Sequence, residues 1–120
     1  MPAYLLLLHE CPADSAALSA AELGDIIRAH QAWADRLAAA GQLLGGEKLT
    51  DDGGRQLRLD GRQPVASDGP YAEAHDVIGG FYMLKAASLA EAEDIAAACP
   101  HRRAGQWIEL REIEAIERGQ

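Results

Sequence analysis

The chain has 120 residues, 48% of them apolar, so it is the size of one domain and can bury a hydrophobic core. Its formal net charge of −8 argues against nucleic acid as a partner, because the chain would repel the phosphates. No apolar run approaches the roughly 20 residues of a transmembrane helix, the first residues lack signal-peptide features, and two cysteines are too few for a disulfide framework. We therefore expect a cytoplasmic protein with reduced thiols that does not bind membranes.

Strands and helices alternate in the first half of the chain. Residues 4–9 carry apolar side chains on both alternating faces, which predicts a strand buried on both sides. Ser19 and Glu22 have the spacing of a capping box, and apolar residues then recur with helical spacing until Gly41. The pattern predicts a helix of about twenty residues, with His30 in the middle of its apolar stripe.

The second half repeats this order after an inserted hairpin. Asp60-Gly61 is typical of a tight turn and separates two short strands, after a strand at 43–50. A strand at 79–86, a helix that begins after Ser88 and ends before Pro100, and a strand at 106–113 complete the chain.

The elements add up to a βαββαβ pattern, which favours a single α+β domain of the ferredoxin-like type, spanning 1–120, with both helices on one face of the sheet. Because residues 4–9 and 79–86 are apolar on both faces, the uncovered face would expose a large apolar patch. We therefore expect a homodimer that packs sheet against sheet.

Candidate chemistry gathers at one end of this fold. The topology brings His9, Cys11, Cys99 and His101 to the same rim as the insert at 50–77. The spacing of these cysteines and histidines matches no zinc pattern, so we expect no metal, and no nucleotide-binding glycine motif is present. The basic run 101–103 is interpreted as a solvated loop.

A buried imidazole needs polar partners, since an unpaired buried polar group costs ~1–3 kcal/mol. For His30, the nearest expected acids are Asp68, Glu73 and Asp76; a backbone carbonyl or a water molecule is the structural alternative. Asp68 also has a purely structural interpretation, because Asp68-Gly69-Pro70 is typical of a turn.

Several segments together resemble a known family. They are the string SDGPYAEAHDVIGGFY at 67–82, SLAEA at 88–92, ACP at 98–100 and IELR at 108–111. This pattern resembles the DGPF branch of the YCII-related family, with Tyr71 in place of the motif's phenylalanine and His75 where a lysine is common. The resemblance implies a dimeric α/β barrel, in agreement with the sheet argument.

The resemblance also implies a type of chemistry. The wider group is similar in fold to muconolactone isomerases and includes a dehydrochlorinase with a histidine and an aspartate as its catalytic pair. Arg28-Ala-His30 resembles the helix segment that carries this histidine, and Asp68 of the motif is our choice for the acid.

Two functional hypotheses follow, and a structural one stands beside them. The first is an isomerase or lyase without metal or organic cofactor that acts on a small carboxylate or lactone, with His30 as general base and Asp68 as its orienting acid. Around this pair we expect Tyr71 or Tyr82 to donate to a developing enolate, Arg58 or Arg62 to hold a carboxylate, and Glu73 to contact the substrate. The second is a non-catalytic ligand-binding or regulatory module for a small acidic molecule. In the structural interpretation His30 is an ordinary core residue with no pocket beside it.

Overall fold

The computed structural model describes residues 1–50, 54–68 and 76–116, and leaves the side chains of Ser15 and Asp68 undescribed. In chain order the elements are β1 (Ala3–Glu10), α1 (Pro12–Ala16), α2 (Ala20–Ala39), β2 (Leu43–Lys48), β3 (Arg55–Asp60), β4 (Gln63–Asp68), β5 (Val77–Lys85), α3 (Leu89–Ala97) and β6 (Trp107–Ile113).

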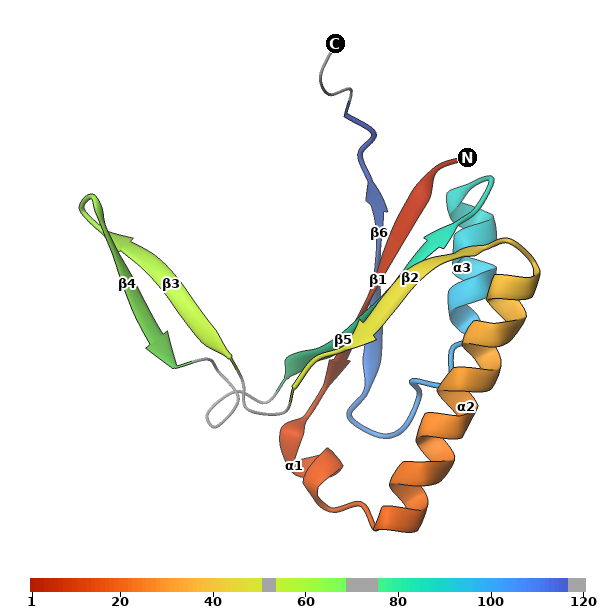
Figure 1. Ribbon diagram of the computed structural model, residues 1–120, viewed down its shortest axis with the longest axis horizontal. Coiled ribbons are helices and arrows are strands. Elements are labelled where there is room, and N and C mark those ends of the chain that lie inside the picture. The colour runs from red at the N-terminus through yellow and green to blue at the C-terminus, as the bar shows by residue number, and fades with distance from the viewer. Residues whose placement is uncertain (51–53, 69–75, 117–120) are drawn as a thin grey trace.

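The main sheet has the strand order β2-β5-β1-β6, and every neighbouring pair is antiparallel. With α2 and α3 on one face (Figure 1), this is the ferredoxin-like α+β fold that the sequence predicts. The short helix α1 was not predicted: its five residues are too few for a hydrophobic period, although Pro12 suits the first position of a helix.

The helix-covered face of the sheet holds the core. Tyr4, Leu6 and Leu8 alternate along β1 and are buried. Leu6 and Leu8 pack in one cluster with Trp33 and Leu37 of α2, and Tyr4 packs in a second cluster with Ala92 of α3. On the other face, the residues of β1 are only half-buried, because no helix or strand in the described ranges covers them. We call this uncovered side, with Leu5, Leu7, Phe81, Met83 and Trp107, the open sheet face.

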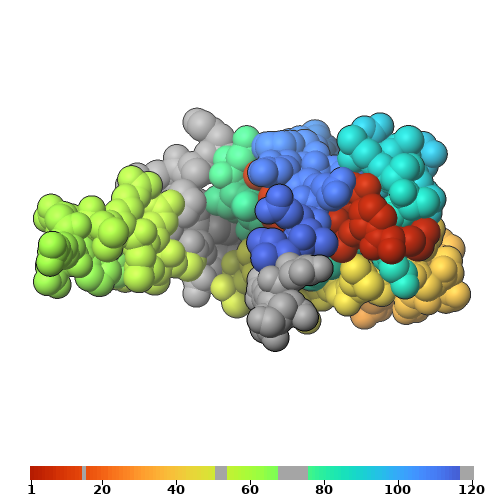
Figure 2. All heavy atoms as spheres, turned by 90° about the horizontal axis from the view of Figure 1, so that it is seen from above, coloured from red at the N-terminus to blue at the C-terminus, as the bar shows by residue number. Residues whose placement is uncertain are grey.

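The inserted strands β3 and β4 form a separate two-stranded sheet. Asp60 pairs with Gln63, and Gly61 has a φ of 64°, the left-handed value that the predicted turn requires of a glycine. Figures 1 and 2 show this hairpin projecting from the main sheet, on the side away from the two long helices. None of the helices in the described ranges is long and apolar enough to cross a membrane.

Candidate functional site

His30 faces the sheet from the middle of α2. The helix begins at the predicted capping box: the Ser19 hydroxyl accepts from the Glu22 backbone N–H, and the Glu22 carboxylate accepts from that of Ser19. Eleven positions after the cap, His30 is half-buried, and its Nδ1 lies 2.7 Å from the Tyr82 hydroxyl on β5. The two rings are nearly parallel, with centroids 5.9 Å apart.

Tyr82 is held in place from two sides. The buried Trp33, three residues after His30 on α2, meets its ring edge-on at 4.9 Å. On the other side is Gly46 of β2, where an added Cβ would come within 2.8 Å of Tyr82 Cδ1. Burial raises the pKa of Tyr82 to about 12, so the phenol keeps its proton at physiological pH.

His101 is the second imidazole at this site. It follows α3 and Pro100, is only 6% exposed, and its ring centroid lies 6.4 Å from that of His30. Its Nε2–H donates to the backbone carbonyl of His9 at 2.7 Å, which leaves the lone pair of the neutral ring on Nδ1. The interpretation of 101–103 as a solvated loop was therefore wrong for His101, because this hydrogen bond satisfies the ring inside the fold.

Both imidazoles are shifted toward the neutral form. Burial lowers the pKa of His30 below its usual 6.5, and the positive charges of His101 and Arg103 lower it further, while Glu10 opposes them. Burial likewise lowers the pKa of His101, although the hydrogen bond to the His9 backbone and the negative charge of Glu10 each raise it in part. The pair is therefore neutral, and able to accept a proton, at neutral pH.

Glu10 and Arg103 supply the charges beside the imidazoles. The Glu10 carboxylate lies against Gly79, where a Cβ on that glycine would collide with it. Arg103 is half-buried, and its positive charge lowers the pKa of Glu22, His30 and His101. Within the described residues no carboxylate forms an ion pair with it.

The sequence of the chain matches a known protein family. A family model of the YCII-related domain matches residues 3–116, nearly the whole chain. The chain is a member of the YCII-related family. No curated protein matches the sequence.

The YCII-related domain brings together some of the predicted site residues. Tyr82 lies against His30, a contact that the sequence did not predict for it. Arg58 and Arg62 are exposed on the projecting hairpin, which stands apart from α2 within one chain. Tyr71, Glu73 and the side chain of Asp68 lie outside the described residues.

The structure adds three residues that the sequence did not predict for this site, namely Glu10, His101 and Arg103. Strand alternation offered a signal for Glu10: it follows Leu6 and Leu8 on the helix-covered face, whereas His9 points to the open sheet face. There His9 stacks on Trp107 at 3.8 Å and pairs with Glu109 at 3.1 Å. His9 and His101 therefore meet at the predicted rim only through the His9 backbone.

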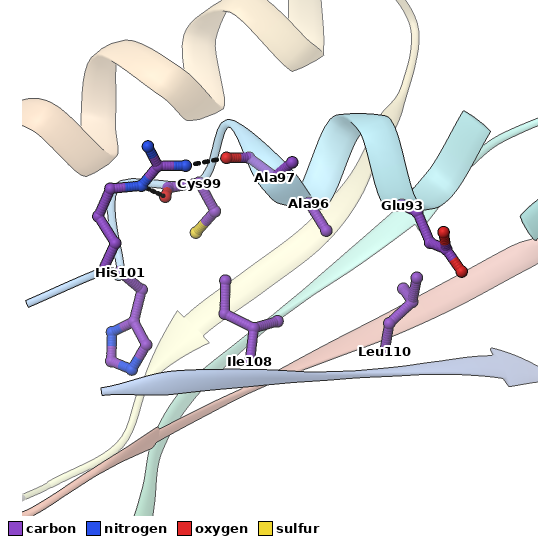
Figure 3. A pocket seen from close by; sticks show the side chains of 8 residues that line it. Glu93, Ala96, Ala97, Cys99, His101, Ile108 and Leu110 are labelled. Carbon is purple, nitrogen blue, oxygen red and sulfur yellow. Dashed lines mark hydrogen bonds between the residues drawn. The ribbon is translucent and has the colours of Figure 1, made fainter. Parts of the chain in front are cut away.

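A groove of about 290 Å³ opens between α3 and β6, next to the His101 ring. His101 lies at one end and Glu93 at the other, with Ala96, Ile108 and Leu110 between them (Figure 3). The Arg102 guanidinium at its rim donates to the carbonyls of Ala97 and Cys99 at the end of α3. The groove therefore offers apolar walls, with its arginine engaged by backbone.

Burial raises the pKa of the Cys99 thiol, which also lines this groove, so the sulfur stays protonated and unreactive. No cluster of three metal-binding side chains occurs in the part of the chain that the structure describes. The two neutral imidazoles, His30 and His101, can accept protons at this site.

Proposed function

We propose that this YCII-related domain binds a small carboxylate or lactone beside His30 and transfers a proton within it, as a lyase or isomerase that uses its own side chains. The observation that carries the proposal is the hydrogen bond of 2.7 Å between His30 Nδ1 and the Tyr82 hydroxyl, next to a second neutral imidazole. A base held in this way typically contributes about 10²–10⁴-fold to a rate.

Tyr82 lets His30 change its protonation state without losing its partner. A phenol oxygen both donates and accepts, so it can accept from Nδ1–H while Nε2 takes a proton from the substrate. Among the described residues, Nε2 of His30 has no hydrogen-bond partner. Every fully buried side-chain nitrogen or oxygen in these residues does have a partner, so Nε2 is not fully buried. The lowered pKa of His30 keeps the ring unprotonated at neutral pH, so it can accept a proton in the reaction.

Charge on the substrate and on the reacted imidazole would be balanced by the neighbours. Arg103 is the cation best placed for a substrate carboxylate, since Arg58 and Arg62 of the same chain lie on the hairpin. Glu10 would stabilise the imidazolium that forms after proton uptake, as its effect on the pKa of His30 indicates. Asp68 stays the orienting acid that the family resemblance suggests.

The same proposal includes a homodimer formed through the open sheet face. Leu5 and Leu7 face cross-strand partners Met83 and Phe81 there, and Trp107 is 46% exposed. Apolar faces of this kind on an otherwise acidic domain are typical of protein interfaces. A second sheet laid on this face would bury them.

The experiment compares wild type with His30→Gln against a panel of muconates and lactones, with products identified by mass spectrometry. His9→Gln is the matched control, because His9 points to the opposite face of the sheet. Conversion that falls at least about 100-fold in His30→Gln and persists in His9→Gln supports catalysis. A compound that raises the melting temperature yet stays intact assigns a non-catalytic binding module instead, and normal turnover by His30→Gln overturns the role of His30.

A further inference from the structure

The projecting β3–β4 hairpin has one apolar face. Register places Leu57 opposite Ala66 and Leu59 opposite Pro64, so these four side chains share a face. The opposite face carries Gln56 opposite Ser67 and Arg58 opposite Val65. This alternation is that of a strand pair with one side meant for burial.

The described part of the same chain leaves this apolar face exposed. Leu57 is 68% exposed and Leu59 is 73% exposed. The radius of gyration of 16.5 Å exceeds the roughly 14 Å expected for a compact domain of this length, in keeping with a hairpin that projects. An isolated two-stranded hairpin is at best marginally stable in water, so contact with another surface would stabilise it.

Position and charge indicate which surface that is. Both views show the hairpin on the side of the sheet away from the helices, which is the side of the open sheet face (Figures 1 and 2). Residues 54–68 contain three arginines and two aspartates, a net charge of +1, so the rest of the chain carries −9. A basic arm on an acidic body is complementary to a second copy of the same body.

We propose that the β3–β4 hairpin is an arm that packs the face with Leu57 and Leu59 against a second copy of this chain, beside the sheet-to-sheet contact. The inference rests on the homodimer proposed above and adds a second contact to it. Symmetry then gives two arms per dimer, each contacting the body of the other copy.

The first test is sedimentation equilibrium on Leu59→Ser, with Val65→Ser as matched control. Val65 is also exposed, but it lies on the other face of the hairpin. Because each dimer would lose two buried leucines, the dissociation constant should rise about 100-fold for Leu59→Ser and less than about threefold for Val65→Ser. Equal effects of the two variants would refute the arm.

The second test places a benzophenone amino acid at position 59 or 65 and irradiates the full-length protein. We expect a covalent dimer from position 59, crosslinked to the body of the other copy, and little from position 65. Crosslinks from position 59 within one chain only would overturn the proposal. If Leu59→Ser dimerises normally and position 59 gives no covalent dimer, the arm contact is refuted and the sheet-to-sheet dimer is retained. A monomeric wild-type protein would contradict both the arm contact and the sheet-to-sheet dimer.

Discussion

Gly46 tests whether close packing around Tyr82 holds the site together. An alanine there would bring its Cβ to 2.8 Å from Tyr82 Cδ1 and 2.9 Å from the Phe81 carbonyl oxygen, where ordinary contacts begin at 3.4 Å. The carbonyl belongs to the backbone of β5, so the strand itself must move by roughly half an ångström. This movement would change the position of the Tyr82 hydroxyl relative to His30.

The expected cost follows from the packing. Overfilling a tight core position costs about 1–3 kcal/mol, and replacing glycine recovers about 0.4–1 kcal/mol from the unfolded chain. Gly46→Ala should therefore lower the free energy of unfolding by about 1–2 kcal/mol. For a domain of this size, the melting temperature should fall by roughly 4–8 °C.

Gly45→Ala is the matched control, because its Cβ would meet nothing within 4 Å and its φ is not in the left-handed region. Thermal unfolding of both variants, with NMR of the His30 ring, gives the comparison. We expect Gly45→Ala to keep the stability and the His30 resonances of wild type, and Gly46→Ala to change both. Equal stability and equal His30 resonances in the two variants would show that close packing at Gly46 does not hold Tyr82 in place.

Three further predictions concern pH, the helix cap and the open sheet face. Stability should fall as pH drops below 6.5, because the pKa of His30 and that of His101 lie below the value of an unfolded histidine, so the unfolded chain takes up protons first. Urea titrations should show a smaller loss in the double variant His30→Gln/His101→Gln, and parallel losses would count against the shifts. Ser19→Ala should cost about 1 kcal/mol in the same assay by removing the cap of α2, and an unchanged midpoint would show that the cap contributes nothing. Leu7→Glu should give a monomer by light scattering while Leu23→Glu, exposed on α2, stays dimeric; a dimeric Leu7→Glu would exclude the open sheet face.

Much of the fold was predictable because local signals agree with the tertiary structure. The capping box at Ser19, the turn glycine Gly61 and the apolar run of β1 each predict an element that the structure contains. These signals act over a few residues, so no long-range information is needed. The five residues of α1 carry no such period and were missed.

The site was only partly predictable, because its contacts are long-range. Helical spacing marks His30 as inward-facing, but nothing in the local sequence selects Tyr82, 52 residues away, as its partner. The burial of His101 depends on a hydrogen bond to a backbone carbonyl 92 residues away in β1. The basic residues that follow His101 in the sequence favour an exposed loop and give no sign of this contact. Both contacts depend on how helices and strands pack against one another in the folded chain, and local sequence patterns do not specify this packing.

The most direct test of the central claim, that two neutral imidazoles share one desolvated site, is a two-dimensional ¹H–¹⁵N NMR titration of the histidine side chains, assigned with single His→Gln variants. We expect His30 and His101 both to titrate below 6.5, with the proton of neutral His101 on Nε2. Titration of both rings at or above 6.5, or a neutral His101 protonated on Nδ1, would contradict it.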